Sequence, residues 1–300
     1  MRDLFPGFET RTIETIGAEI FLRVGGSGPP VLMLHGYPQT HAMFHKIAPD
    51  LARNFTVVVP DLRGYGDSSC PANDPDNFTY SKRAMGQDMV HVMQALGFTL
   101  FNVVGHDRGG RVAYRMALDY PERVQRLAVL DIVPTHAMWH GLSVDLAMKV
   151  YHWLFLAQPS PLPEMLIARA PNDYQDYTMA TWTKTHDLSA FAEDALRHYH
   201  RFFADPAHIK ATCDDYRAGQ TYDLHADEAD FEAGNKITCP LFALWGDAGI
   251  PGETESPLEI WRQWGSRVSG MAIDSGHFVA EENPEATLLA LVQFLTTKDG

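Results

Sequence analysis

The segment Gly105-His106-Asp107-Arg108-Gly109-Gly110-Arg111 decides how this chain folds. An apolar run at residues 101–104 precedes it and a helical pattern over 112–118 follows it. This order matches the form G-x-nucleophile-x-G, in which a strained turn between strand and helix lifts one side chain above a sheet. The nucleophile position holds a carboxylate, Asp107, which predicts attack at carbon followed by ester hydrolysis. Two arginines beside it predict an anionic substrate.

Apolar runs and helical patterns alternate on both sides of this segment. Short apolar runs of the kind buried on both faces of a parallel sheet occur at 31–34, 56–59, 101–104, 126–131, 239–245 and 268–273. Helical spacing predicts helices over 81–96 and 284–295, and loose alternation over 11–24 predicts an opening antiparallel hairpin. Strands that alternate with helices indicate an α/β fold with a mostly parallel, doubly wound sheet.

The alternation breaks between about residues 134 and 223, where aromatic-rich helical patterns occur without a convincing buried strand. A helical segment inserted into an open α/β sheet is expected to lie over the strand ends, where such sheets bind ligands. We therefore expect an α/β core domain formed by residues 1–134 and 224–300. Residues 135–223 are expected to form a helical cap.

Composition narrows the classes of partner. The chain carries 24 basic and 38 acidic residues, a net charge of −14, with no basic stripe for a nucleic-acid backbone. Its three cysteines are widely spaced, which argues against a disulfide framework and fits a reducing cytoplasm. No run approaches 18 apolar residues and the first residues lack a signal core, so we expect a cytoplasmic protein without a membrane partner.

The other candidate catalytic residues follow predicted strands. The order nucleophile, acid and late histidine is that of the α/β-hydrolases. His277 comes after the last strand and is the candidate base. Asp131 and Asp247 each end a strand, so either could orient the imidazole; we favour Asp131 and keep Asp247 as the alternative.

His41 and His45 share one helical face, as metal ligands can, but no third ligand is evident. The sequence therefore predicts neither a metal nor a cofactor.

Several motifs together resemble the fluoroacetate (haloacetate) dehalogenases of the α/β-hydrolase superfamily. The resemblance runs from about Phe5 to the last helix. It is carried by the segment quoted above and by His35-Gly36-Tyr37-Pro38, Leu130-Asp131-Ile132-Val133-Pro134-Thr135, Tyr151-His152-Trp153 continuing to Gln158, and Asp214-Asp215-Tyr216-Arg217-Ala218-Gly219.

The resemblance implies a role for each site residue. Asp107 would attack the halogen-bearing carbon, and His277, supported by Asp131, would activate the water that hydrolyses the ester. Backbone N–H groups of Tyr37 and Arg108 would form the oxyanion hole. The substrate carboxylate would bind the side chains of Arg108 and Arg111, and the halide would bind His152, Trp153 and Tyr216. The resemblance further implies a small anionic haloacid as substrate, a hydroxy acid and halide as products, and a homodimer.

Epoxide hydrolases and haloalkane dehalogenases share the aspartate nucleophile and remain alternatives. Both act on neutral substrates, and Arg108 next to the nucleophile would place a charge in their apolar pocket. A non-catalytic binding protein of the same fold is a third possibility, against which the intact nucleophile, base and acid argue.

Overall fold

The computed structural model describes residues 3–249 and 256–297. Within these residues, eight strands form one sheet in the order β1-β2-β4-β3-β5-β6-β7-β8. The pairs β1–β2 and β2–β4 are antiparallel, and the remaining neighbours are parallel. The predicted opening hairpin and mostly parallel sheet are therefore confirmed. The strands are β1 (Glu9–Glu14), β2 (Glu19–Gly25), β3 (Pro30–Leu34), β4 (Thr56–Pro60), β5 (Phe101–His106), β6 (Val124–Leu130), β7 (Leu241–Gly246) and β8 (Val268–Ile273).

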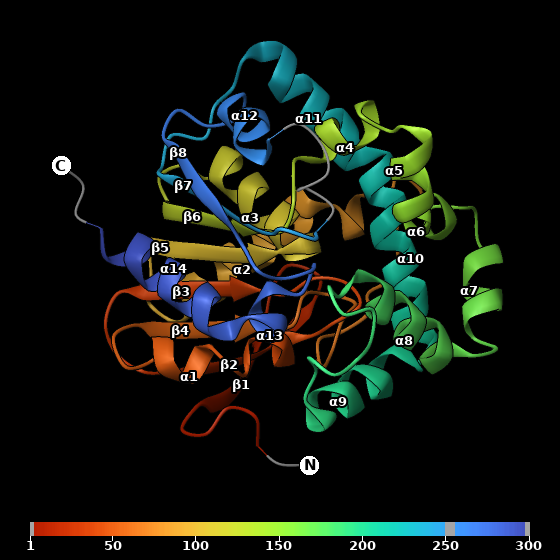
Figure 1. The fold of residues 1–300 in the computed structure, drawn as a ribbon, viewed down its shortest axis with the longest axis horizontal. Helices are drawn as coiled ribbons and strands as arrows, with labels where there is room; N and C mark the ends of the chain where they lie inside the picture. The colour runs from red at the N-terminus through yellow and green to blue at the C-terminus, as the bar shows by residue number, and fades with distance from the viewer. Residues whose placement is uncertain (1–2, 250–255, 298–300) are drawn as a thin grey trace.

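Helices cover both faces of the sheet (Figure 1). Leu32 and Leu34 of β3 pack in the cluster that includes residues of α2 (Lys82–Ala95) and α3 (Asp107–Asp119). Val31 and Met33 of the same strand pack on the opposite face, with α1 (Ala48–Leu51) and α14 (Pro284–Thr296). Burial on both faces explains why β3 is a continuous apolar run instead of an alternating one.

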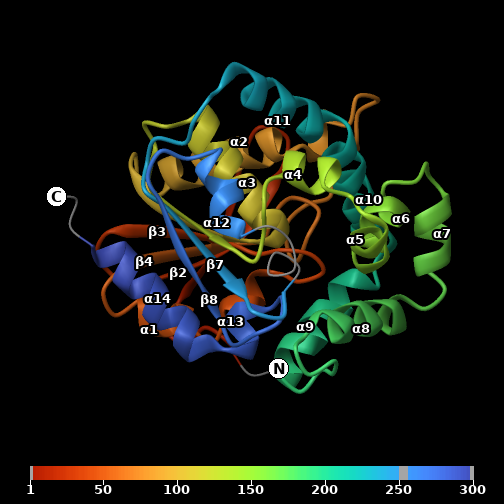
Figure 2. The same ribbon diagram turned by 45° about the horizontal axis from the view of Figure 1, so that its top comes forward.

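Residues 135–233, between β6 and β7, form helices joined by loops and contain no strand, and we call these residues the helical insertion. Figures 1 and 2 show its helices gathered on one side of the sheet. The insertion extends past the predicted boundary at residue 223 because α11 continues to Ala233; a separate cap domain stays a prediction. Its helices are α4 (Thr135–His140), α5 (Val144–Lys149), α6 (Tyr151–Leu156), α7 (Leu162–Ile167), α8 (Pro171–Trp182), α9 (Glu193–Phe203), α10 (Pro206–Gln220) and α11 (Tyr222–Ala233).

The remaining helices are short: η1 (His41–Phe44), η2 (Phe78–Tyr80), α12 (Pro257–Arg262) and α13 (Val279–Glu282). No helix in the described part of the chain has the length and apolar character that a membrane span requires.

Four buried charged side chains join the insertion to the core. Asp215 of α10 accepts hydrogen bonds from Arg108 of α3 at 2.6 and 3.0 Å, and it also pairs with Lys82 of α2. The Lys82 Nζ lies 3.5 Å from Asp223 Oδ2 of α11. These side chains are at most 6% exposed. Two positive and two negative charges therefore compensate one another, since an uncompensated buried charge costs several kcal/mol.

Asp215→Ala should strongly destabilise the protein because it leaves Arg108 and Lys82 without their shared carboxylate. We expect the free energy of unfolding in urea to fall by about 3–5 kcal/mol, the loss typical of a broken buried pair. Glu193→Ala is the control, since Glu193 pairs with Arg197 on the exposed surface of α9 and its loss should change little. Equally small changes in both variants would contradict this role for Asp215.

Candidate active site

The strand register brings several predicted site residues to one edge of the sheet. Leu34 of β3 pairs with Gly105 of β5, while Leu130 of β6 pairs with His106 and with Leu244 of β7. The loops that follow these parallel strands therefore begin side by side. Tyr37, Asp107 and Asp131 lie just beyond the ends of β3, β5 and β6, as the sequence pattern predicts.

Asp107 occupies a strained turn. Its φ is +45°, and α3 begins at this residue directly after β5. Neighbouring positions tolerate no side chain, because a Cβ at Gly105 would lie 2.4 Å from Gly109 O and one at Gly109 would lie 2.3 Å from His35 O. A left-handed non-glycine residue costs about 1–3 kcal/mol, and such strain is common at functional sites. This geometry is that of a nucleophile elbow.

The Asp107 carboxylate is buried but ionised. Its Oδ1 accepts the backbone N–H of Tyr37 at 2.8 Å, so one predicted oxyanion-hole donor already contacts it. Arg108, the source of the other predicted N–H, lies in the first turn of α3, where backbone donors have no partner within the helix. Burial alone would raise the pKa of Asp107, but the positive charges of His277, Arg108 and Arg111 bring it below its ordinary value.

His277 and Asp131 form a hydrogen-bonded pair. The His277 Nδ1 lies 2.6 Å from Asp131 Oδ2, and Asp131 Oδ1 accepts the N–H of Gly246 at 2.9 Å. Burial would lower the pKa of His277, but the bond to Asp131 and its charge raise the pKa above the ordinary value. The buried His277 Nε2 has no hydrogen-bond partner in the described part of the chain, so it is available to a water or substrate.

The alternative acid lies elsewhere. Asp247 is about half exposed and pairs with Lys184 at 2.8 Å. The geometry therefore favours Asp131 as the residue that orients His277.

The two arginines have different surroundings. Arg108 directs Nε and Nη2 to the Asp215 carboxylate, and its guanidinium carbon lies 4.2 Å from the centre of the Tyr216 ring. Among the described residues, Arg111 bonds only neutral acceptors through Nη1, namely Val133 O at 3.0 Å and Thr135 Oγ1 at 3.1 Å.

Arg111 is a buried cation without a carboxylate partner. It makes no ion pair within residues 3–249 and 256–297, and its buried Nε has no hydrogen-bond partner there. Burial is the main cause that lowers the pKa of Arg111, with the charge of Arg108 acting in the same direction. Its guanidinium carbon lies 4.5 Å from the centre of the Trp153 ring, which stabilises the cation in part. A bound carboxylate would supply the missing counter-charge.

Three predicted halide donors are brought together from the insertion. His152 and Trp153 of α6 lie beside Tyr216 of α10, with ring centres 5.6 and 6.2 Å from that of the tyrosine. Burial lowers the pKa of His152 to about 3, so its imidazole is neutral, and burial keeps the Tyr216 hydroxyl protonated by raising its pKa. The His152 Nδ1 and Tyr216 hydroxyl are buried without partners in the described residues.

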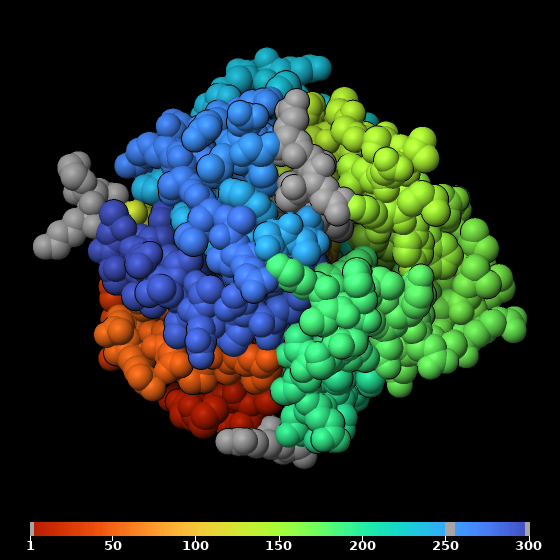
Figure 3. Space-filling model, viewed as in Figure 1, coloured from red at the N-terminus to blue at the C-terminus, as the bar shows by residue number. Residues whose placement is uncertain are grey.

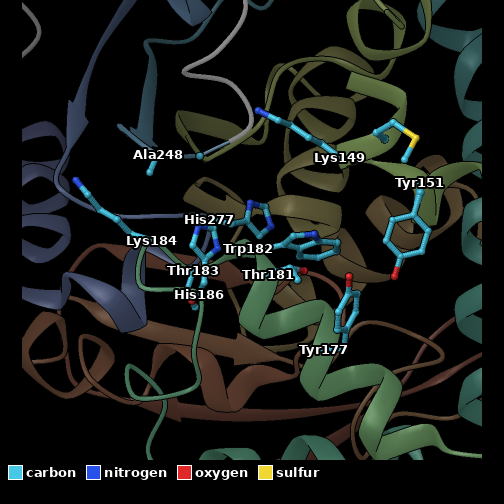
Figure 4. A pocket seen from close by; sticks show the side chains of 12 residues that line it. Lys149, Tyr151, Tyr177, Thr181, Trp182, Thr183, Lys184, His186, Ala248 and His277 are labelled. Atoms are coloured by element: carbon cyan, nitrogen blue, oxygen red, sulfur yellow. The ribbon is translucent and has the colours of Figure 1, made fainter. Parts of the chain in front are cut away.

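Two cavities meet at His277 and Trp182. The inner one has a volume of about 20 Å³, close to the 10–15 Å³ that a single water needs, so it suits only a very small ligand. It is lined by Asp107, Arg111, Asp131, Ile132, Val133, Met138, His152, Trp153, Trp182 and His277. The outer cavity is about 550 Å³, and Figure 4 shows Trp182 and His277 side by side, with Tyr151 and Tyr177 on the far side of Trp182 from His277.

Sequence reasoning left two important side chains without a role. Asp215 stands within the motif at 214–219, but its partner Arg108 is 107 residues away, and no local pattern predicts that pair. Trp182 belongs to no motif quoted above, and it lines both cavities.

The helical pair His41 and His45 does not form a joint site. His41 Nδ1 lies 3.0 Å from Asp61, while His45 Nδ1 lies 2.9 Å from Ala42 O. Among the described residues, no group of three or more His, Cys, Asp or Glu side chains is arranged to hold a metal ion.

Similarity to known proteins identifies the family of this chain. The model of the alpha/beta hydrolase fold matches residues 29–284. A fluoroacetate dehalogenase from Burkholderia sp. is 41% identical, covering 98% of this chain and 95% of its own. A soluble epoxide hydrolase from Corynebacterium sp. is 31% identical, covering 90% and 91%. The crystal structure of an alpha/beta-hydrolase-fold protein from Nostoc sp. is 52% identical, with a TM-score of 0.94 over 97% of this chain and 99% of its own. The chain thus belongs to the α/β-hydrolase superfamily, as a relative of the fluoroacetate dehalogenases, and the resemblance of its motifs is confirmed.

Proposed function

We propose that this protein hydrolyses the carbon–halogen bond of fluoroacetate and related 2-haloacids. The products are the hydroxy acid, glycolate from a haloacetate, and the halide. The observation that carries the proposal is that one small cavity is lined by an ionised carboxylate, Asp107, and by a buried cation, Arg111, that has no carboxylate partner among the described residues. The 41% identical fluoroacetate dehalogenase supports the same substrate class.

In the first step, an Asp107 oxygen bonds to the halogen-bearing carbon and the halide leaves with the electron pair of the broken bond. Nucleophile and substrate both carry negative charge, and two such charges 4 Å apart repel by about 4 kcal/mol at an effective dielectric constant near 20. Arg111 offsets this repulsion by binding the substrate carboxylate. Arg108, already paired with Asp215, adds a weaker attraction and positions the Tyr216 ring.

The leaving halide needs donors that are in place before the bond breaks. His152, Trp153 and Tyr216 offer an imidazole N–H, an indole N–H and a phenol O–H. Since the imidazole is neutral and the phenol protonated, both can donate to the halide. A preorganised donor of this kind commonly accelerates a reaction by about 10²–10³-fold.

In the second step the neutral form of His277 is the base, and ester formation favours it by removing the Asp107 charge that helps to raise the pKa of His277. Water attacks the carbonyl carbon of the Asp107 ester and transfers a proton to His277 Nε2. The N–H groups of Tyr37 and Arg108 stabilise the oxyanion. The bond between that carbon and the ester oxygen attached to the substrate carbon then breaks, and the proton on His277 passes to this departing oxygen, which leaves in the hydroxy acid. The water oxygen stays on Asp107, and the second water proton is released as the carboxylate forms again. Asp131 supports this step by holding the His277 ring and stabilising its positive form.

We further propose that residues 135–223 act as a cap, that no metal or cofactor takes part, and that the enzyme works as a homodimer in the cytoplasm. Large apolar side chains of the insertion support self-association, since Val144 is 81% and Met148 73% exposed. The three cysteines of the chain form no disulfide, which is compatible with a reducing compartment.

An epoxide hydrolase is the second candidate. Two observations favour it: the 31% identical relative, and the Tyr216 hydroxyl, which has no partner among the described residues and could protonate an epoxide oxygen. The Arg111 cation in the inner cavity disfavours it, because a neutral epoxide offers the guanidinium no carboxylate to bind.

A halide-release assay decides between these candidates. We expect the purified protein to release fluoride, chloride or bromide from the corresponding haloacetate and to form equimolar glycolate, detected by ion chromatography. Styrene oxide is the neutral comparison and should give little diol. Diol formation without halide release would overturn the proposal.

His277→Asn should separate the two chemical steps. Because this histidine is assigned only to ester hydrolysis, the variant should release about one halide per active site and then stall. Mass spectrometry should show the Asp107 peptide heavier by one carboxymethyl group. Asp107→Asn is the matched control and should give neither halide nor adduct; an unmodified peptide in a His277→Asn variant that still releases halide would exclude the ester.

Arg111→Met should chiefly impair anionic substrates, since methionine keeps much of the side-chain length but removes the charge. The loss of a buried charge pair predicts a fall in kcat/KM for chloroacetate of about 10²–10³-fold. Chloroacetamide, which lacks the carboxylate, should lose less than about tenfold. An equal loss for both substrates would show that Arg111 does not bind the carboxylate.

A further inference from the structure

The Glu282 carboxylate connects the loop that carries His277 with the helical insertion. Its Oε2 accepts the backbone N–H of Gly276 at 2.9 Å and that of Lys184 at 2.8 Å, and its Oε1 accepts the N–H of Phe278 at 2.9 Å. The two amides on either side of His277 are therefore bonded to one side chain. The third comes from the insertion just after α8.

The N–H of His277 itself donates to Trp182 O at 2.9 Å. Three consecutive amides, 276 to 278, are thus fixed, two of them by Glu282. The loop at Gly276 lies close to the backbone at the end of α8, because a Cβ at Gly276 would lie 2.5 Å from Lys184 N and 2.6 Å from Trp182 O. Figure 3 shows atoms of the insertion, in green, in contact with atoms of the C-terminal segment, in blue.

The placement of this backbone matters to the site because it determines where the imidazole lies. Asp131 holds one end of the His277 ring through Nδ1. The Trp182 ring stands nearly perpendicular to it, with centres 5.4 Å apart and an interplanar angle of 82°. Asp107 and His277 line the same inner cavity, so the place of Nε2 relative to Asp107 depends on the positions of this loop and of the end of α8.

We propose that Glu282 is a positioning residue for the base: it keeps His277 and Trp182 in the relative positions that ester hydrolysis needs. The inference rests on the proposed function, because it assigns Glu282 to the second step of that reaction. The first step does not use the imidazole as a base, so loosening this loop should leave halide displacement largely intact.

The chemistry of the site requires a carboxylate. Its oxygens accept three N–H groups and have no hydrogen to direct at them. A glutamine would turn its own N–H₂ towards at least one of these donors, and an alanine would leave all three without the acceptor. Glu282→Gln therefore disturbs the three hydrogen bonds with little change in side-chain shape. Glu282→Ala removes all three.

The kinetic experiment follows halide release from chloroacetate by rapid quench in both variants. Each should show a burst of about one halide per site at a rate within threefold of wild type. Steady-state turnover should then fall about 10-fold in Glu282→Gln and 100-fold in Glu282→Ala, with the Asp107 ester accumulating in the mass spectrum. Glu285→Ala, an exposed residue of the adjoining helix, is the control and should match wild type.

Hydrogen exchange gives a readout that does not depend on turnover. The amides of Gly276, Phe278 and Lys184 should exchange at least 10-fold faster in Glu282→Gln than in the Glu285→Ala control. Normal exchange at these amides, unchanged turnover, or a proportional loss of burst and steady state without ester would each overturn the role of Glu282. Absence of halide release by the wild type would instead refute the proposed function itself.

Discussion

The ion pair between Arg108 and Asp215 is the interaction on which the arrangement of this site depends. Arg108 follows the nucleophile directly, so whatever fixes its guanidinium also fixes the surroundings of Asp107. Asp215 contributes two carboxylate contacts and a backbone acceptor, all buried. Because Asp215 belongs to α10, the pair fastens the insertion to the elbow and places Tyr216, the next residue, over the Arg108 guanidinium.

The same pair controls the charge of the inner cavity. With Arg108 compensated by Asp215, the second arginine of the cavity is Arg111, which bonds only a carbonyl and a hydroxyl in the described part of the chain. Holding an ion there without a carboxylate partner costs free energy that a carbonyl and a hydroxyl recover only in part. Such an arrangement is unfavourable for stability alone, and it becomes favourable when an anionic ligand supplies the missing charge.

Features encoded locally were predictable from the sequence. The strands at 31–34 and 101–104 are continuous apolar runs. The G-x-nucleophile-x-G turn is recognisable because its glycines stand where a Cβ would clash with the backbone. The acid was harder, because Asp131 and Asp247 both end strands and only the three-dimensional structure shows which contacts His277. The sequence did not identify Asp215 as a site residue because its partner Arg108 is 107 residues away. It did not identify Glu282 because the partners of Glu282 are backbone amides, which every residue type except proline provides.

Contacts at different points of the insertion serve different parts of the proposed reaction. Thr135 at its start contacts Arg111, and Asp215 of α10 holds Arg108, so these contacts bear on substrate binding and halide displacement. The end of α8 contacts His277 through Trp182 O and reaches Glu282 through the Lys184 N–H, so this region bears on ester hydrolysis. The insertion therefore contacts both the arginines and the loop of the base. Because it supplies contacts to both the arginines and the base, a displacement of α8 alone would impair the second step while leaving the carboxylate site of the first intact.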